Sequence, residues 1–396
     1  MSSKYLFFIC FYFIFKPFNF SQIRTDFTLK LDGADREYIV VKPSGIDPPG
    51  GYPVVFMFHG TSGNGEQFYN TSKWKEKGEI EKFITVFPSS LRYCILNFPD
   101  NNPVFLTRWN TGDLQADKCP NLQQDFKDDI RFVRQMVDTI KQKYSVNSKK
   151  IFAAGFSNGC SMIHKLAVEA PDVFSAVAGV ASILQPLDSM KASKSIPIWN
   201  VIGTEDERFE YVFGISPLPF GGDSVLLYLN SYISRLQVCE GLTNSYSKVS
   251  TPNAVSYTYD TPVIPGNPGK FILTLVKGMD HIYPNGVNFP FAATDFFWEF
   301  FNQVSTSETK NLISASDDCK IYPNPSNDQM IIDVSSMPDI GRYDILVYNL
   351  LSQQVLVSRN NSEKQYILSK EMTGSGLFIL QVKSNLKQMT RRITFE

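Results

Sequence analysis

The residues best suited to chemistry are Gly-Phe-Ser-Asn-Gly at 155–159, which have the pattern G-x-S-x-G. Residues 150–154 before the motif predict a strand, and residues 158–169 predict a helix. A serine at such a strand–turn–helix junction stands above the sheet, where its hydroxyl can act as a nucleophile. The pattern is weak in isolation, and a tight turn without chemistry is the alternative. In this setting Ser157 is the candidate nucleophile.

The base for this serine must come from one of three histidines, His59, His164 and His281. His281 is the best placed, because it follows the apolar run 271–276 in a loop, and loops at strand ends carry the functional groups of such sheets. His164 lies two turns along the helix that follows Ser157, which favours a packing role. His59 precedes a glycine-rich loop, and we expect it to order that loop.

A carboxylate should hold the imidazole of such a base. It is expected at another strand end, between the serine and the histidine in chain order. The strand expected at 198–202 is followed by Gly-Thr-Glu-Asp-Glu, in which Asp206 is the candidate. Glu205 and Glu207 flank it, and the residues alone leave the choice open. An acidic surface turn without a catalytic role is the alternative interpretation.

Two backbone amides should bind the oxyanion of a tetrahedral intermediate. The residue after the nucleophile, Asn158, supplies one, and we assign Thr61, in the glycine-rich loop 59–65, as the other. The glycines of this loop also suit a phosphate cradle, but no Gly-Lys-Ser/Thr follows and the spacing is not G-x-G-x-x-G. With three histidines and no CxxC pair, the sequence predicts neither a cofactor nor a metal site.

These candidates lie in a segment, residues 27–304, where short apolar runs alternate with helical patterns. The runs are rich in Val, Ile and Phe, as in strands buried on both faces. Helices are expected at 122–144, where apolar residues recur every three to four positions, and at 158–169 and 292–304. Strands are expected at 37–41, 54–58, 83–87, 151–155, 176–180, 198–202 and 271–276. Such alternation predicts an α/β fold with a mostly parallel sheet and helices on both faces.

The rest of the chain suggests three further parts around a catalytic domain at 22–304. Residues 1–21 carry one basic residue before an uncharged run of signal-peptide length, with a membrane anchor as the alternative. Polar residues without periodicity at 305–318 predict a linker. Residues 319–396 contain short alternating strands separated by turns and predict a small β-sandwich.

Charge and cysteine content narrow the class of protein. The 396 residues include 38 basic and 39 acidic side chains, for a net charge of −1. This balance argues against a dedicated nucleic-acid surface. Export would permit up to two disulfides among Cys94, Cys119, Cys160, Cys239 and Cys319, and their spacing does not reveal the pairing.

The motif around Ser157 and the residues that follow it resemble a known family. The Gly-Phe-Ser-Asn-Gly motif, followed by Leu-Ala-Val-Glu-Ala-Pro-Asp-Val-Phe-Ser-Ala-Val-Ala at 166–178, resembles the polyhydroxyalkanoate depolymerase, feruloyl esterase and acetylxylan esterase group of the α/β-hydrolases. His-Gly at 59–60, Gly-Thr-Glu-Asp at 203–206 and Asp-His-Ile-Tyr-Pro at 280–284 are similar to the group's remaining landmarks, in the same order. The resemblance spans roughly residues 38–301.

This resemblance implies the α/β-hydrolase fold and a triad of Ser157, Asp206 and His281. It favours Asp206 over its glutamate neighbours, because the group's acid is the aspartate of a Gly-Thr-x-Asp turn. The sequence departs from the group at Cys160, where a second glycine is usual, at Ile202, where a histidine is usual, and at 208–209, where Arg-Phe replaces Val-Pro. These departures leave the triad intact and the substrate open.

The C-terminal part resembles a second family. Ile-Tyr-Pro-Asn-Pro at 321–325, Val-Tyr-Asn-Leu-Leu-Ser-Gln at 347–353, and Gly-Leu-Phe-Ile-Leu-Gln-Val at 376–382 with Arg391 and Arg392 are similar to the C-terminal sorting domain of the type IX secretion system of Bacteroidota. The resemblance implies passage through that machinery, then release or attachment at the cell surface. A carbohydrate-binding β-module is the alternative, and it would need a platform of exposed aromatic residues.

Together these expectations describe an exported, monomeric serine esterase that acts through an acyl-enzyme. Its expected substrates are feruloyl or acetyl esters of polysaccharide, or a polyhydroxyalkanoate-type polyester. We expect His59, Trp109 and Tyr283 to border the substrate; Trp109 resembles a tryptophan near the group's acyl pocket, and a structural role is the alternative. A serine peptidase of the same fold, or a surface binding protein with a degenerate hydrolase domain, are the other functions that the sequence leaves open.

Overall fold

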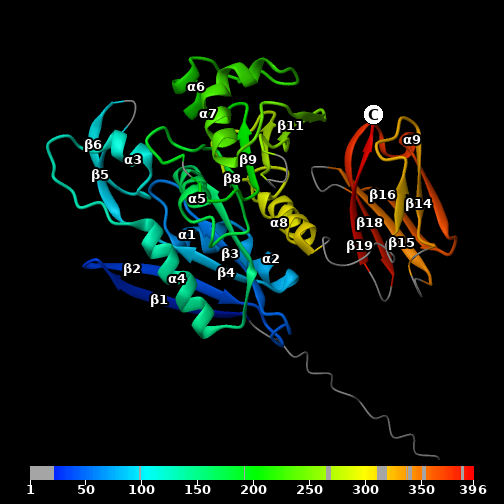
Figure 1. Cartoon of the computed structure of the whole chain (residues 1–396), viewed down its shortest axis with the longest axis horizontal. Helices are drawn as coiled ribbons and strands as arrows, with labels where there is room; N and C mark the ends of the chain where they lie inside the picture. The colour runs from blue at the N-terminus through cyan, green and yellow to red at the C-terminus, as the bar shows by residue number, and fades with distance from the viewer. Residues whose placement is uncertain are drawn as a thin grey trace, which may run out of the picture.

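The computed structural model describes residues 22–97, 100–190, 192–264, 269–309, 319–335, 337, 341–349, 354–384 and 388–396. The expected signal peptide, residues 1–21, and residues 310–318 of the expected linker lie outside the described residues. An α/β domain is followed by a smaller all-β domain near the C-terminus (Figure 1). No helix in the described ranges has the length and the apolar composition that crossing a bilayer requires.

A large sheet forms the centre of the α/β domain. In the described residues it has ten strands, in the order β1-β2-β4-β3-β7-β8-β9-β12-β11-β10. The strands are β1 (Ile23–Leu31), β2 (Ala34–Lys42), β3 (Tyr52–Phe58), β4 (Ile84–Pro88), β7 (Val146–Phe156), β8 (Ala176–Val180), β9 (Ile198–Gly203), β10 (Ser247–Ser250), β11 (Ala254–Tyr259) and β12 (Phe271–Val276). The strands from β4 to β12 run parallel, and β1, β2, β11 and β10 pair antiparallel at the two edges. The predicted mostly parallel sheet is confirmed.

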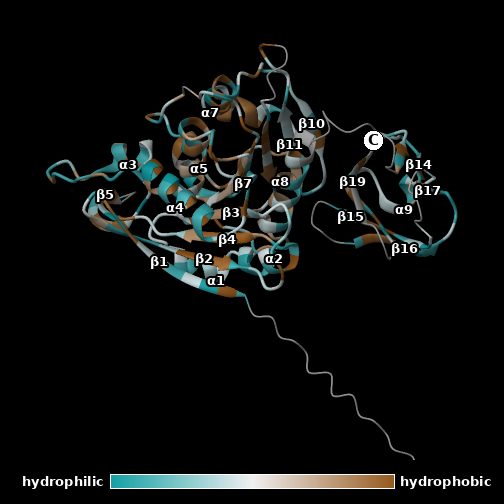
Figure 2. Cartoon of the chain, turned by 60° about the horizontal axis from the view of Figure 1, so that its bottom comes forward, coloured by the Kyte–Doolittle hydropathy of each residue, from teal (hydrophilic) through white to brown (hydrophobic). Residues whose placement is uncertain are grey.

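Helices cover both faces of this sheet (Figure 1). One face carries α1 (Gly65–Thr71), α2 (Trp74–Glu81) and α8 (Ala293–Thr309), and the other carries α4 (Asp129–Lys143), α5 (Asn158–Glu169) and α7 (Ser224–Glu240). Alternate residues of β3 point into two different cores. Val54, Phe56 and Phe58 belong to the core formed with α4, α5 and α7. Val55 and Met57 belong to the core formed with α1, α2 and α8. Figure 2 shows hydrophobic residues concentrated in the central strands β3 and β4. The sheet therefore holds the carboxyl ends of its parallel strands in a rigid frame.

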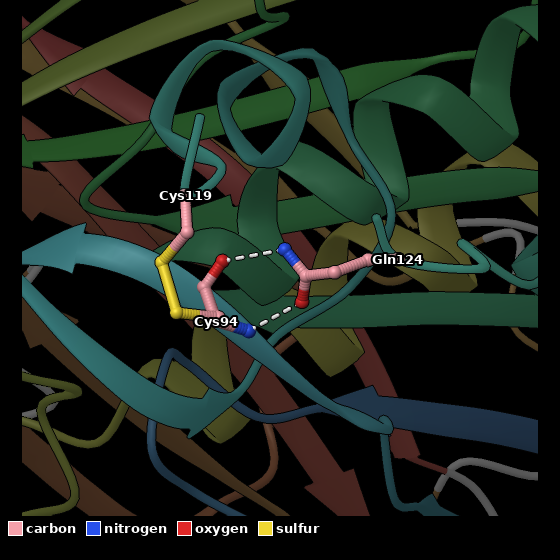
Figure 3. Close-up of a disulfide and its surroundings, with 3 residues drawn as sticks. All are labelled: Cys94, Cys119 and Gln124. Carbon is pink, nitrogen blue, oxygen red and sulfur yellow. Dashed lines mark hydrogen bonds between the residues drawn. A yellow bond between two sulfur atoms is a disulfide. The ribbon is translucent and has the colours of Figure 1, made fainter. Parts of the chain in front are cut away.

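A hairpin outside the large sheet has no counterpart in the sequence prediction. It consists of β5 (Arg92–Asn97) and β6 (Asn102–Thr107), and the short helix α3 (Gly112–Asp117) follows it. A disulfide joins Cys94 on β5 to Cys119 after α3. The side chain of Gln124 accepts a hydrogen bond from the Cys94 N–H (2.6 Å) and donates one to the Cys94 carbonyl (2.9 Å), as Figure 3 shows. Residues 119–124 are thus fastened to the hairpin.

Two helix ends differ from the sequence prediction. The helix expected at 122–144 begins at Asp129, because the Asp128 carboxylate caps it by accepting from the Arg131 N–H (3.0 Å) and Phe126 packs on the ring of Tyr93 instead. The helix expected at 292–304 extends to Thr309, so residues 305–309 of the expected linker are helical. In the first case apolar spacing extended the predicted helix too far towards its N-terminus, and in the second the polar residues after 304 ended the predicted helix too early.

The C-terminal domain pairs two sheets around one core. In the described residues the sheets have the orders β13-β14-β17 and β16-β15-β18-β19. Their strands are β13 (Lys320–Tyr322), β14 (Gln329–Asp333), β15 (Tyr343–Asn349), β16 (Gln354–Asn361), β17 (Gln365–Ser369), β18 (Gly376–Ser384) and β19 (Gln388–Phe395), with the short helix α9 (Lys370–Thr373) after β17. Apolar side chains of both sheets, such as Met330, Ile332, Ile345 and Leu380, are buried between them. The predicted small β domain is confirmed.

Candidate active site

The candidate nucleophile stands on a sharp turn between β7 and α5. Ser157 has φ 52° and ψ −125°, a strained conformation for a residue with a side chain. Its neighbouring glycines permit this turn, since a Cβ on Gly155 would lie 2.3 Å from the Gly159 carbonyl oxygen, and one on Gly159 would lie 2.2 Å from the Phe58 carbonyl oxygen. The Ser157 N–H donates to the Val180 carbonyl (2.9 Å), which ties the turn to β8.

Three side chains from distant parts of the sequence form one hydrogen-bonded chain at this turn. The Nε2 atom of His281 lies 2.9 Å from the Ser157 hydroxyl oxygen, and its Nδ1 atom lies 2.9 Å from both carboxylate oxygens of Asp206. A carboxylate accepts hydrogen bonds, so Nδ1 carries the proton and Nε2 is left to accept from the serine. The His281 ring also packs on Phe156, with ring centroids 5.2 Å apart.

The choice of acid among three neighbours is decided by their burial and hydrogen bonds. Asp206 follows β9 with a fully buried side chain, and one of its oxygens also accepts from the Arg208 N–H (3.0 Å). Glu205 and Glu207 are exposed to solvent. The structure therefore brings Asp206, and neither glutamate, to the histidine that faces Ser157.

The two amides assigned to the oxyanion hole are available for a ligand. In the described part of the chain, neither the Thr61 N–H nor the Asn158 N–H has an acceptor within the protein, although Asn158 is buried. Asn158 is the first residue of α5, so its amide points out of the helix at the positive end of the helix dipole. Both amides are thus placed where the sequence analysis expects the oxyanion hole.

Two of the residues expected at the substrate are instead fully buried supports. His59 has no solvent exposure, and its Nδ1 atom lies 2.7 Å from the Gly60 carbonyl while its Nε2 accepts from the Ser90 N–H (3.0 Å). Burial lowers the pKa of His59 to about 4, so the ring is neutral. Trp109 is equally buried and donates from Nε1 to the His59 carbonyl (2.9 Å). The expectation that these two side chains touch substrate does not fit their burial.

Tyr283, the third residue expected at the substrate, lines a cavity of about 260 Å³ beside the triad. The cavity lies between the loop at 60–63, helix α1 and the loop that carries His281. Its wall is mixed: Phe68 and Phe156 are apolar, and Gln67 is polar. The Tyr283 hydroxyl accepts from Trp74 Nε1 (2.9 Å), and burial raises its pKa, which keeps it protonated. A larger hollow of about 930 Å³ lies against α8, and no triad residue borders it.

The remaining histidine and the unusual cysteine pack inside the domain. His164 is fully buried in α5, and burial lowers its pKa to about 4. Cys160 is fully buried as well, and burial raises the pKa of its thiol, so it stays protonated and unreactive. Its Sγ atom occupies the space where Gly179 lacks a side chain, since a Cβ on Gly179 would lie 2.4 Å from it. The packing role predicted for His164 fits its position.

A segment in which the sequence analysis singled out only Trp109 contacts the candidate site at several points. Residues 107–111, which run from the last residue of β6 to the residue before α3, hydrogen-bond to the loop at 59–63 and to the side chain of Asn158. Most of these bonds involve backbone groups, which leave no signature in the sequence. Among the described residues, no cluster of three or more His, Cys, Asp or Glu side chains is arranged to hold a metal ion.

The comparisons with known families agree with this architecture. Residues 47–221 match the model of the phospholipase/carboxylesterase family. The large domain has the α/β-hydrolase fold. The matched segment contains Thr61, Ser157 and Asp206, while His281 lies beyond its end.

The proteins to which the chain is similar include several that are named as esterases. The chain is 23% identical over 232 residues to a bifunctional acetylxylan esterase/xylanase of Neocallimastix patriciarum. This alignment covers 57% of this chain and 28% of that protein. It is 26% identical over 190 residues to feruloyl esterase B of Piromyces equi, covering 47% and 32%. The chain thus spans less than a third of the length of these curated relatives. A solved acetyl xylan esterase from Aspergillus awamori aligns with a TM-score of 0.48 and 15% identity, over 71% of this chain and 99% of that one.

The C-terminal domain has a match of its own. Residues 320–396 match the model of the secretion system C-terminal sorting domain. This match agrees with the motifs that resemble type IX sorting domains. The protein is therefore exported by the type IX secretion system and is released or attached at the cell surface.

Proposed function

We propose that the protein is an exported serine esterase that hydrolyses carboxylic esters through an acyl-enzyme. The observation that carries this proposal is the hydrogen-bonded chain from Ser157 through His281 to the buried Asp206, with 2.9 Å at each step. A serine hydroxyl is a weak nucleophile and gains reactivity from such a base, oriented by a carboxylate.

In the proposed acylation step, the Ser157 oxygen attacks the ester carbonyl while His281 Nε2 takes the hydroxyl proton. The imidazolium that forms is stabilised by the carboxylate of Asp206, whose burial strengthens the charge interaction. The Thr61 and Asn158 amides stabilise the oxyanion of the tetrahedral intermediate. Collapse of the intermediate expels the alcohol, which receives the proton from His281.

Deacylation repeats these roles with water in place of serine. The side chain of His281 is 15% exposed, so water from the mouth of the site can approach Nε2. The imidazole removes a proton from that water, the resulting hydroxide attacks the acyl carbon, and Ser157 leaves with the proton. Both half-reactions pass through the same oxyanion site.

For the substrate, we propose feruloyl or acetyl esters of polysaccharide, with a polyhydroxyalkanoate-type polyester as the competing class. The names of the fungal relatives and export by the sorting domain favour polysaccharide esters. The cavity beside the triad, with Phe68, Phe156 and Tyr283 in its wall, is suited to an apolar or aromatic group. Activity of purified protein on feruloyl, acetyl and hydroxybutyrate esters will rank the classes.

We also propose that the protein acts as a monomer, which size-exclusion chromatography with light scattering tests.

The central test replaces the nucleophile. Ser157→Ala should lower kcat on p-nitrophenyl acetate by a factor of at least about 10⁴ while the thermal unfolding midpoint stays close to that of wild type. Ser175→Ala is the matched control, because Ser175 lies before β8, where its hydroxyl donates to the Lys149 carbonyl (2.7 Å). A Ser157→Ala protein that keeps its activity contradicts the assignment of the nucleophile.

Labelling distinguishes the remaining functions. A fluorophosphonate probe should modify the wild type at Ser157 and leave the Ser157→Ala variant unlabelled. Absence of both labelling and ester hydrolysis in folded wild-type protein would favour a non-catalytic binding protein. Labelled protein that cleaves peptides and spares esters would identify a peptidase instead.

A further inference from the structure

The two amides of the proposed oxyanion hole belong to separate segments, so something must hold them at a fixed separation. Thr61 lies in the loop after β3, and Asn158 lies at the start of α5. Donors of this kind are effective because they are already in place when charge develops, and small displacements weaken them. Residues 107–111, here called the brace, contact both segments.

On the loop side, the brace bonds to residues on both sides of Thr61. The Thr107 carbonyl accepts from the Ser62 N–H (2.9 Å), and the Thr107 hydroxyl donates to the Gly63 carbonyl (2.6 Å). Trp109 Nε1 donates to the His59 carbonyl (2.9 Å). The peptide that carries the Thr61 N–H is therefore held from either end by one neighbouring segment.

On the helix side, the brace holds the side chain of the residue that supplies the other amide. The Asn158 Oδ1 atom accepts from the Trp109 N–H (2.7 Å), and its Nδ2 donates to the Thr111 hydroxyl (2.9 Å). Asn158 is 3% exposed, so water does not compete for these bonds. The backbone N–H of Asn158 is thus free to bind the oxyanion, while its side chain is hydrogen-bonded to the brace.

The brace is itself fixed from outside the site. Arg108 pairs with Asp113 (2.8 Å) and Asp117 (2.7 Å) of α3, and the Asn110 N–H donates to Asp129 (2.7 Å). The disulfide between Cys94 and Cys119 closes the stretch of chain that contains the brace (Figure 3). These restraints make the brace rigid, so it can fix the positions of the loop that carries Thr61 and of the first residue of α5.

We propose that residues 107–111 position the two amides of the oxyanion hole relative to each other, with Thr107 and Thr111 as positioning residues. Thr107 acts on the loop of Thr61, and Thr111 acts on Asn158. This inference rests on the proposed serine esterase function. It concerns stabilisation of the transition state, and it predicts an effect on kcat with little effect on KM.

The test removes one hydroxyl at a time. Thr107→Val and Thr111→Val keep the shape of the side chain and delete its hydrogen bonds, and each should lower kcat on p-nitrophenyl acetate roughly tenfold or more, since loss of a whole donor costs 10²–10³. KM should stay within about twofold of wild type. Thr107→Ser and Thr111→Ser keep the hydroxyl and should retain wild-type kcat. Thr139→Val is the matched control, because that hydroxyl donates to the Gln135 carbonyl within α4 (2.9 Å) and also interacts with the Tyr38 side chain on β2, outside the brace.

A transition-state analogue separates positioning from general loosening. An aliphatic trifluoromethyl ketone forms a tetrahedral adduct with the active serine, and its oxyanion occupies the hole. Its inhibition constant should rise by the same factor by which kcat falls in each Val variant. Unchanged kcat, or a lower kcat with unchanged inhibition by the ketone, would overturn the proposal.

Folding failure and failure of the proposed function give different results. Cys94→Ser/Cys119→Ser removes the disulfide that restrains the brace and leaves the hydroxyls of Thr107 and Thr111 intact. It should lower kcat and weaken inhibition by the ketone by the same factor. This double variant tests the proposal if the Val variants do not fold. Wild type that hydrolyses the ester while every variant keeps its kcat contradicts the inference alone. Wild type without any esterase activity contradicts the proposed function.

Discussion

The two buried histidines make a quantitative prediction about acid stability. His59 and His164 are fully buried, and burial lowers the pKa of each from 6.5 to about 4. Well above pH 6.5 both rings are neutral in the folded and the unfolded chain, so their ionisation does not affect stability. As the pH falls through 6.5 towards 4, the unfolded chain binds protons that the folded chain refuses, and the folded state loses stability.

The magnitude follows from the size of the pKa shift. The fall of each pKa from 6.5 to about 4 corresponds to about 3 kcal/mol per histidine once protonation of the unfolded chain is complete. Between pH 7.5 and pH 5.0 the same relation gives about 2 kcal/mol for each histidine, and about 4 kcal/mol for both. Other groups also titrate in this range, so the contribution of one histidine must be isolated by substitution.

Urea unfolding of wild type and His164→Leu at pH 7.5 and 5.0 isolates that contribution. All four tryptophans of the sequence, Trp74, Trp109, Trp199 and Trp298, lie in the α/β domain, so their fluorescence reports on that domain. The variant should lose about 2 kcal/mol less than wild type between the two pH values.

Met162→Leu, at another fully buried position of α5, is the matched control and should keep the wild-type pH dependence. An identical pH dependence in wild type and His164→Leu would refute the account of a histidine held neutral by burial.

Two further predictions concern the stability of the folded chain. Ser157→Gly should be more stable than Ser157→Ala by about 1–2 kcal/mol in urea unfolding at pH 7.5, because glycine adopts the positive φ of the turn without strain; equal stabilities would mean that the turn stores no strain. Cys94→Ser/Cys119→Ser should lower the free energy of unfolding by about 3 kcal/mol, since the disulfide closes a loop over a separation of 25 residues. An unfolding midpoint in urea equal to that of the oxidised wild type would contradict that value.

Sequence reasoning located the elements that have strong local signals. The apolar runs of the central strands and the strand–turn–helix setting of Ser157 predicted β3 and α5 close to their observed bounds, and located the end of β7, which begins five residues earlier than predicted. The same reasoning put His281 after a strand, where the structure has it. Parallel strands place their carboxyl ends at one edge of the sheet, so residues that follow such strands meet in space even when they lie 124 positions apart.

Features determined by long-range contacts could not be decided from the residues alone. The choice between Asp206 and its glutamate neighbours depends on which side chain is buried, and burial of a turn is a property of the folded sheet. The roles of His59 and Trp109 depend on hydrogen bonds to backbone groups of residues such as Gly60 and Ser90, which any sequence can provide. The β5–β6 hairpin pairs residues with mixed polarity over a small core, so its strands lack a clear apolar pattern.

The beginning of α4 shows how a local signal can mislead. Apolar residues at 122 and 126 extend the helical spacing of the residues after 129, and this spacing predicted a longer helix. In the structure Phe126 belongs to the small core under the hairpin, and the Gln124 side chain is bonded to Cys94. The disulfide holds these residues on the hairpin, and the Asp128 cap starts the helix after them.

The close packing of Cys160 against Gly179 makes these two positions interdependent. The thiol occupies the volume that a side chain at 179 would need, so Gly179→Ala alone produces a clash. Cys160→Gly alone leaves a void between α5 and β8. A side chain at 179 is therefore compatible only with a smaller residue at 160, and a library that varies 179 alone would sample mainly destabilised proteins. Redesign of this site should treat the pair as a single unit.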